Sequence, residues 1–212
     1  MPQLLTFGDS NTHGTPPIVT RGEYDRFDSA TRWPRLTQAA LGPAWELAEE
    51  GLPGRTAQFN DPVMGDIMHG VPGFHMALQS HGRIDVLTLM LGTNDVKYRF
   101  GATPETVAGG IAGLLDIALG LEMQTRHNGF KILLICPPAV QEVGVLAGEF
   151  YGAAAKSRAL PPIYRALASA RGIGFLDAGL HIETSPVDGV HFDKAAHRIL
   201  ANAVTAAITS LS

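Results

Sequence analysis

The sequence lacks several features that would define particular classes of protein. Its single cysteine, Cys136, cannot form an internal disulfide and lies in the apolar run 132–136, which predicts a buried thiol in a reducing compartment. The formal net charge is −4 and no run of lysine or arginine occurs, which argues against nucleic-acid binding. The N-terminus has no basic signal region, and no apolar stretch approaches the ~20 residues that cross a bilayer. These absences favour a cytoplasmic protein that contacts neither nucleic acid nor membrane.

Signatures of cofactors and metals are also missing. No Walker or dinucleotide-binding glycine pattern occurs, so we expect no nucleotide cofactor. His69, His75 and His81 are six residues apart, which is not a recognised spacing of metal ligands; roles in solvated loops or subunit contacts are commoner. We therefore expect no metal site. The histidines expected to be ordinary surface or boundary residues are His127, His181 and His197.

The composition is that of a folded domain. Hydrophobic residues make up 45% of the chain and charged residues 17%, which excludes disorder and coiled coil, and 212 residues are most simply one domain, 1–212. Five short apolar segments predict strands, and two of them are apolar almost throughout, as in a parallel sheet covered on both faces. The predicted strands are 3–7, 45–48, 86–91, 131–136 and 173–176.

Helical patterns lie between the predicted strands. Thr103 and Pro104 begin one pattern as N-cap and first helical residue, and Asp193 caps another. Alternation of strands and helices predicts an α/β fold with helices on both faces of the sheet. Segments 58–81 and 137–156 exceed ordinary connections and are expected to form lids or interface elements. The predicted helices are 30–41, 104–125, 157–170 (interrupted or restarted at its two prolines) and 194–211.

The first predicted strand ends abruptly in Gly8-Asp9-Ser10, followed by a turn-prone Asn11. This pattern delivers one serine to the carboxyl edge of a sheet, where a helix N-terminus supplies free N–H groups and partial positive charge. Such a serine is either a helix cap, the commoner case, or a nucleophile. The G-x-S-x-G elbow of ordinary α/β-hydrolases is absent, so the choice depends on finding a base, an acid and an oxyanion site elsewhere.

Three later turns supply such groups. Asn94 follows the third strand and is either an oxyanion donor or part of a turn that merely ends the strand. Gly54 lies in a glycine-proline turn that can direct a backbone N–H at a ligand. Asp188 and His191 are three residues apart, so the carboxylate can orient the imidazole, although an isolated pair is more often only a loop.

Each of these signals is weak alone, but all four lie where a strand ends or a helix begins. That edge is where open α/β sheets bind ligands. Together they supply a nucleophile, a base, an orienting acid and two kinds of oxyanion donor. The complete set in this order predicts a serine hydrolase.

On these motifs the chain resembles the SGNH hydrolases, also called GDSL-type esterases, over essentially its whole length. The four letters correspond to Ser10, Gly54, Asn94 and His191. The resemblance implies a three-layer α/β/α sandwich with a five-stranded parallel sheet in the flavodoxin-like order 2-1-3-4-5. It also implies a catalytic triad and an oxyanion hole made by the N–H groups of Ser10 and Gly54 and the amide of Asn94. The implied triad is Ser10, Asp188 and His191.

A closer resemblance is to the oligomeric arylesterase and acyltransferase branch, through residues 11–14, 32–34, 51–56, 142–144 and 152–157. It implies hydrolysis of small acyl esters, with transfer to alcohols or peroxide in some members, by dimers that assemble further, often to octamers.

Asp9, Asn11 and Lys97 are predicted to contact substrate, although a solvated lysine is commoner. Asn11 replaces the leucine of the family name, at a variable position. Four apolar residues of segment 58–81 are expected either to form the wall of an acyl or alcohol pocket or, at least as commonly, to pack in a core or interface. They are Met64, Met68, Phe74 and Met76.

The leading hypothesis is a serine esterase acting on small-molecule, acetyl-type esters, including aryl esters, through an acyl-serine. A xylan-type carbohydrate acetylesterase with the same catalytic groups is the alternative, and 7% aromatic residues with an apolar, methionine-rich insertion argue weakly against it. A non-catalytic acyl-binding domain is the alternative of a different class. It is disfavoured because a retired site would tolerate the loss of one catalytic residue.

Overall fold

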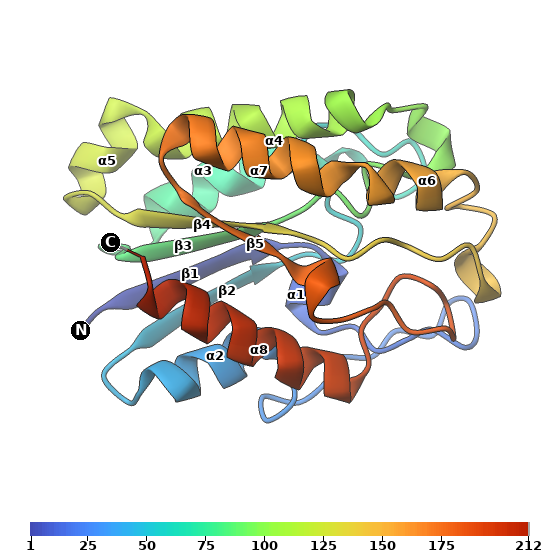
Figure 1. Cartoon of the computed structure of the whole chain (residues 1–212), viewed down its shortest axis with the longest axis horizontal. Helices are drawn as coiled ribbons and strands as arrows, with labels where there is room; N and C mark the ends of the chain where they lie inside the picture. Colours follow the sequence, from blue (N-terminus) through green and yellow to red (C-terminus); the bar gives the residue numbers. More distant parts are fainter. Residues whose placement is uncertain (212) are drawn as a thin grey trace.

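The computed structural model describes residues 1–211 and contains a parallel sheet of five strands in the order β2-β1-β3-β4-β5 (Figure 1). This confirms the predicted fold class and strand order. The order reverses between β1 and β3, so the carboxyl ends of these two strands flank the switch point where such sheets bind ligands. The strands are β1 Gln3–Gly8, β2 Glu46–Gly51, β3 Val86–Met90, β4 Lys131–Cys136 and β5 Gly174–Asp177.

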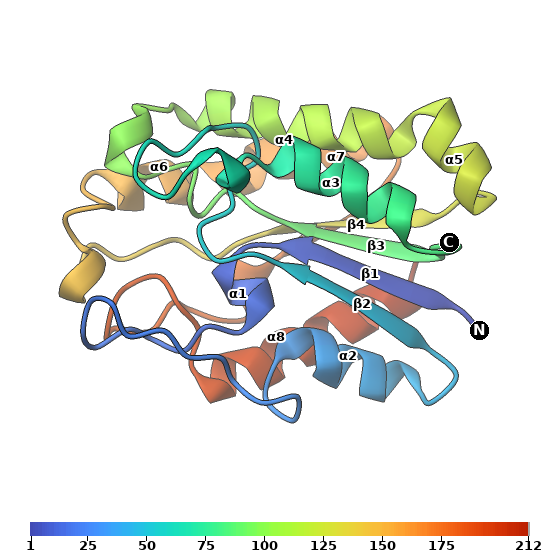
Figure 2. The same ribbon diagram turned by 180° about the vertical axis from the view of Figure 1, so that it is seen from behind.

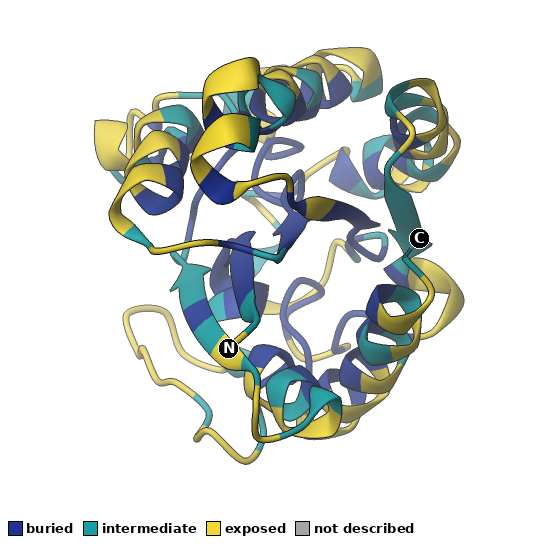
Figure 3. Cartoon of the chain, turned by 90° about the vertical axis from the view of Figure 1, so that its left-hand side faces the viewer, coloured by how far each residue is buried: buried dark blue, intermediate teal, exposed yellow. Residues whose placement is uncertain are grey.

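Helices cover both faces of the sheet, as Figures 1 and 2 show from opposite sides. α3, α4, α5, α6 and α7 lie on one face and α2 and α8 on the other. The helices turn their buried residues inward, as Figure 3 shows, so both faces of the sheet are covered. This explains why β3 and β4 are apolar almost throughout. The bounds are α1 Ser10–His13, α2 Trp33–Leu41, α3 Gly70–Ser80, α4 Pro104–Leu119, α5 Leu121–His127, α6 Ala153–Arg158, α7 Leu160–Arg171 and α8 Lys194–Thr209.

Two predicted helices are each divided in the structure. The helix predicted at 104–125 breaks at Gly120, whose extended backbone separates α4 from α5. The helix predicted at 157–170 is α6 and α7, and α7 restarts with proline at its first positions, where a missing N–H is harmless. In the part of the chain that is described, no single helix is long and apolar enough to cross a membrane; only α4 and α5 together, bent by 52°, reach that length and composition.

Segment 58–81 contains a helix that the sequence analysis left as a connection. In α3, His69 caps the first turn by accepting a hydrogen bond from the N–H of Val71 at Nδ1. Two glycines in the first turn obscure the helical pattern. Gly70 is required there because a Cβ would collide with the carbonyl of Thr56. The segment is therefore a packed part of the domain, and Phe74 and Leu78 extend its core.

The expectation that His127 and His197 are surface or boundary residues is wrong, because both are buried. His127 accepts a hydrogen bond from the N–H of Ile84 at Nδ1, and its Nε2 lies 2.9 Å from the carbonyl of Leu78. His197 accepts from the N–H of Trp33 at Nδ1. A neutral imidazole that accepts from the backbone can be buried without a counter-charge.

His197 makes the stability of the protein sensitive to acid. Burial lowers its pKa to about 4, with the charge of Asp193 opposing and that of Arg32 adding to the shift. Between pH 6.5 and 4 the unfolded chain therefore binds a proton that the folded chain does not, and stability falls as the pH falls. We expect His197→Asn, which keeps an acceptor near Nδ1, to remove a loss of about 3 kcal/mol between pH 7 and pH 4.

Urea unfolding at the two pH values measures this difference. The exposed His181 provides the matched control, His181→Asn. An equal loss of stability on acidification in wild type and His197→Asn would contradict the prediction.

Candidate active site

Ser10 reaches the carboxyl edge of the sheet because β1 ends at Gly8 and α1 begins at once. Asp9 caps α1 by accepting a hydrogen bond from the N–H of Asn11 at 2.9 Å. A side chain at position 8 would collide with Thr12 and with the carbonyl of Met90, so only glycine allows this close turn. The N–H of Ser10 is left at the helix N-terminus without an intrahelical partner.

A continuous chain of hydrogen bonds joins Ser10, His191 and Asp188. His191 Nε2 lies 3.1 Å from Ser10 Oγ, and its Nδ1 lies 2.6 Å from Asp188 Oδ2. All three side chains are buried, with Ser10 and His191 at the cavity wall. The loop before α8 and the turn after β1 are thus brought together from opposite ends of the sequence, as the motif order predicts.

The carboxylate of Asp188 is held by backbone groups on both of its oxygens. Oδ1 accepts from the N–H groups of Val190 and His191 at 2.9 and 3.0 Å, and Oδ2 accepts from the N–H of Ile18 at 2.7 Å. Burial alone would raise the pKa of Asp188, but the hydrogen bond and charge of His191 and these backbone donors hold it below its ordinary value. The group therefore stays ionised and fixes the His191 ring.

Gly54 and Asn94 line the same cavity as Ser10. Gly54 has a φ of 89°, a conformation that favours glycine. The amide nitrogen of Asn94 donates to the carbonyl of Arg55 at 3.1 Å, and Asp95 Oδ1 accepts from the N–H of Ala57 at 2.8 Å. These two bonds tie the turn after β2 to the turn after β3. The two predicted oxyanion donors are thus held beside Ser10.

Arg55 is a buried residue of the site that sequence reasoning did not single out. Its Nη1 donates to the carbonyl of Gly8 at 2.9 Å and to that of Glu50, and the guanidinium lies 4.0 Å from the ring centroid of Phe7. Burial lowers its pKa to about 10, so it remains charged at neutral pH. Arg55 fastens the carboxyl ends of β1 and β2 beneath the Gly54 turn. The sequence signals for Arg55 were its position next to Gly54 and its place in 51–56, a segment that carries the family resemblance.

Two of the three predicted substrate contacts do not line the cavity. Asp9 is fully buried as the α1 cap, and burial raises its pKa to about 6. Asn11 Nδ2 donates to the carbonyl of Val190 at 3.1 Å, and its Oδ1 accepts from the N–H of Phe192 at 3.2 Å. Asn11 therefore links the turn that carries Ser10 (the serine turn, residues 8–11) to the loop that carries Asp188 and His191 (the histidine loop, residues 187–192). Asn11 lies between the turn after β1 and the loop before α8, away from the cavity wall.

The cavity above Ser10 has a volume of about 100 Å³. Lys97, the third predicted substrate contact, lines it and is only 4% exposed, so the alternative of a solvated lysine is wrong. Of the four pocket candidates in segment 58–81 only Met64 lines the cavity; Met68 and Phe74 are buried in the domain and Met76 is exposed. The lining residues are Ser10, Thr15, Ile18, Tyr24, Pro53, Gly54, Met64, Asn94, Lys97, Leu146, Glu149, Phe150, Val190 and His191.

Segment 137–156 supplies part of the cavity wall and is packed against the histidine loop. The N–H of Gln141 donates to the carbonyl of Gly189 at 2.8 Å. A Cβ on Gly189 would collide with the carbonyl of Gln141, and one on Gly144 would collide with that of Val187. The backbone of segment 137–156 is therefore in direct contact with the backbone of residues 187–189. The wall residues Leu146, Glu149 and Phe150 follow this contact in the chain.

Sequence reasoning also missed the third wall of the cavity, which the loop after α1 contributes. Thr15, Ile18 and Tyr24 reach the cavity from this loop, where no motif marks them. Within residues 1–211, no three His, Cys, Asp or Glu side chains lie close enough to hold a metal ion.

A serine–histidine–aspartate chain at the carboxyl edge of a 2-1-3-4-5 sheet is the arrangement of the SGNH class of hydrolases. The chain belongs to the GDSL-like lipase/acylhydrolase family, whose model matches residues 6–199. The protein is accordingly a carboxylic ester hydrolase.

Solved structures of similar chains agree with this family. Est24, a carbohydrate acetylesterase from Sinorhizobium meliloti, is 32% identical over 99% of both chains, with a TM-score of 0.93. The aryl esterase of M. smegmatis is 32% identical over 100% of both chains, with a TM-score of 0.92. Among curated protein sequences none matches this chain significantly.

Proposed function

We propose that this protein hydrolyses small, acetyl-type acyl esters, including aryl esters, through an acyl-serine intermediate on Ser10. The observation that carries the proposal is the unbroken chain of hydrogen bonds from Ser10 Oγ through His191 to Asp188. The cavity volume of about 100 Å³ supports a short acyl group, because drug-sized ligands occupy pockets of roughly 300–1,000 Å³.

The reaction follows from this geometry. His191 Nε2 takes the proton of Ser10 as Oγ attacks the ester carbonyl, and Asp188 stabilises the resulting imidazolium. The oxyanion accepts hydrogen bonds from the N–H groups of Ser10 and Gly54 and from the amide of Asn94. His191 then gives its proton to the departing alkoxide, and water attacks the acyl-enzyme with the same histidine as base.

We also propose that alcohols compete with water for the acyl-enzyme. Ile18, Leu146 and Phe150, from two different segments, give the cavity an apolar surface near Ser10. Such a surface favours an alcohol over water at the acyl carbonyl, and peroxide is included only because the family resemblance implies it. We further propose a single SGNH domain, 1–212, and a cytoplasmic location. We also propose a homo-oligomer, dimer-based and extending to an octamer, with the exposed edge-to-face pair Tyr98 and Tyr151 as a candidate subunit contact.

Active-site labelling tests the proposal. A fluorophosphonate probe should add one adduct per chain, mapped to Ser10, and wild type should hydrolyse phenyl acetate faster than phenyl octanoate. Absence of an adduct would instead support a non-catalytic acyl-binding domain.

A carbohydrate acetylesterase is the second candidate, favoured by the similarity to Est24. Comparing acetylated xylo-oligosaccharide with phenyl acetate as substrates separates the two. A higher kcat/KM for the oligosaccharide would replace the arylesterase proposal while leaving Ser10 as nucleophile.

Asn94→Ala should reduce kcat strongly while leaving the protein folded. One lost oxyanion donor lowers kcat by roughly 10²–10³-fold. The bond from Asn94 to the carbonyl of Arg55 is also lost, so thermal unfolding should be measured beside kcat. Gln58→Ala is the control, because Gln58 is also an amide that bonds a backbone carbonyl, that of Thr106, but lies outside the cavity. Equal kcat in Asn94→Ala and wild type would show that Asn94 does not donate a hydrogen bond to the oxyanion.

A further inference from the structure

Lys97 places an ammonium group at the cavity without a strong hydrogen-bond acceptor among the described residues. Its side chain is buried, and Nζ lies 3.7 Å from the thioether of Met64, 3.9 Å from a carboxylate oxygen of Glu149 and 5.7 Å from the ring centroid of Phe150. A thioether is a weak acceptor, and 3.9 Å is too long for a hydrogen bond. An ammonium has three donors, and buried charges are ordinarily both paired and hydrogen-bonded.

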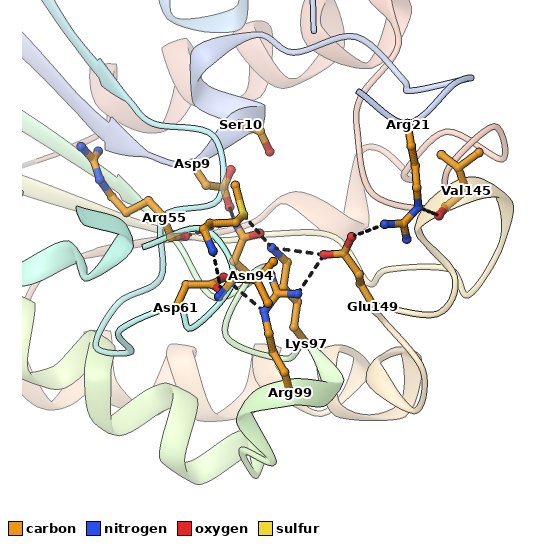
Figure 4. Close-up of polar contacts among 12 residues, drawn as sticks. Asp9, Ser10, Arg21, Arg55, Asp61, Asn94, Lys97, Arg99, Val145 and Glu149 are labelled. Atoms are coloured by element: carbon orange, nitrogen blue, oxygen red, sulfur yellow. Dashed lines mark hydrogen bonds and ion pairs between the residues drawn. The ribbon is translucent and has the colours of Figure 1, made fainter. Parts of the chain in front are cut away.

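Glu149 does not neutralise Lys97, because two arginines already hold it. Figure 4 shows Arg21 and Arg99 converging on Glu149, at 3.2 and 3.1 Å. Arg99 also pairs with Asp61 at 2.8 Å. Three cations thus face two carboxylates in this cluster. The charge left over is that of Lys97, the only one of the three cations that lines the cavity.

A second polar group in the cavity also lacks a partner. The hydroxyl of Thr15 is buried, lines the cavity and makes no hydrogen bond with any described residue. Buried hydroxyls are nearly always hydrogen-bonded. Two unsatisfied donors around one small cavity indicate a ligand that brings its own oxygen acceptors.

We propose that Lys97 binds an anionic oxygen group, typified by a carboxylate, on the ester that is cleaved at Ser10. The inference rests on the proposed function and names its substrate class: esters that carry a negative charge close to the scissile bond. Lys97 acts as a specificity-determining residue that touches the substrate and takes no part in the proton transfers. The Lys97 ammonium donates a charge-assisted hydrogen bond to the anionic oxygen of the ester, which Glu149 is too distant to accept.

The charge of Lys97 also predicts how the preference depends on pH. Burial and the neighbouring charge of Arg99 lower the pKa of Lys97 to about 8, against the opposing charges of Glu149, Asp61 and Asp9. Above that pH the ammonium loses its proton in the free enzyme. The preference for an anionic ester should therefore decline above about pH 8.

The test compares kcat/KM for matched pairs of esters that differ in one carboxylate. Monomethyl succinate against methyl butyrate places the charge on the acyl side, and 3-acetoxybenzoate against phenyl acetate places it on the alcohol side. For one pair, Lys97→Met should lower the anionic-to-neutral ratio of kcat/KM at least tenfold. Lys97→Arg should restore the ratio and keep it above pH 8, because a guanidinium stays charged.

Lys131→Met serves as the matched control, since Lys131 is exposed and bonds the carbonyl of Leu211 at the start of β4. Its ratios should equal those of wild type. A Lys97→Met enzyme that is folded and labelled by fluorophosphonate, but has wild-type ratios for both pairs, overturns the inference alone. A wild-type enzyme that takes no label and cleaves none of the four esters overturns the proposed function.

Discussion

Ser10→Ala is expected to lower kcat for small esters by roughly 10⁴–10⁶-fold, the range seen when a serine nucleophile is removed from a triad. The reason is geometric, because Ser10 Oγ is the hydroxyl that His191 Nε2 contacts at 3.1 Å. The fold should survive, since Asp9 and not Ser10 supplies the side-chain cap of α1. Steady-state hydrolysis of p-nitrophenyl acetate measures kcat, and thermal unfolding reports on the fold.

Ser80→Ala is the control for this change. Ser80 is exposed, and its hydroxyl donates to the carbonyl of Met76 within α3, away from the cavity. It should keep both turnover and fluorophosphonate labelling, whereas Ser10→Ala should lose both. Wild-type turnover in Ser10→Ala would show that another group forms the acyl-enzyme or that none is formed.

Asp188→Asn is expected to lower kcat by about 10⁴-fold, as loss of the triad aspartate does elsewhere. The carboxylate accepts four hydrogen bonds, from His191 Nδ1 and from the N–H groups of Ile18, Val190 and His191. An amide turns an NH₂ group toward some of these donors, so His191 loses both its tautomer and its orientation. The histidine loop should also loosen, which lowers the unfolding temperature.

The rate of fluorophosphonate labelling, measured beside thermal unfolding, separates a catalytic role of Asp188 from a merely structural one. Loss of the carboxylate should slow the labelling of Ser10 in a protein that is still folded, because His191 is no longer oriented to take the serine proton. Asp116→Asn is the matched control, because Asp116 is an exposed carboxylate paired with Arg171. A kcat within tenfold of wild type in Asp188→Asn would contradict the role of Asp188.

Four of the strands were predictable because each is a short, largely apolar run closed by a turn. The exception is β2, whose sequence ELAEEG is mostly polar and whose second half lies beyond the predicted range 45–48. The strand order came from the family resemblance and not from the runs themselves. Helices were predictable where a cap precedes an apolar stripe, as at Thr103 and Pro104 before α4. α3 was missed because Gly70 and Gly73 weaken the helical pattern. Those glycines serve packing, where Gly70 lies against the carbonyl of Thr56, and local propensity carries no record of that contact.

The geometry of the candidate triad followed from the order of the motifs, but its surroundings did not. The loop that brings Thr15 and Ile18 to the cavity has no regular pattern, and its contact with Asp188 joins residues 170 positions apart. The burial of Lys97 and His197 was equally hidden. A polar side chain can be buried only when distant residues supply its surroundings, and no local pattern encodes them.

The backbone contact between segment 137–156 and the histidine loop bears on redesign of the cavity. Some wall residues lie on a segment that contacts the histidine loop, and others do not. Leu146 and Phe150 belong to a wall joined to the histidine loop by two close backbone contacts, Gly144 on Val187 and Gly189 on Gln141. Enlarging that wall risks displacing the general base. Met64 comes from segment 58–81, and its unbranched side chain lies against Gly54 and Lys97, so replacing it does not disturb the contact with the histidine loop. New acyl-chain specificities should therefore evolve first from the Met64 side.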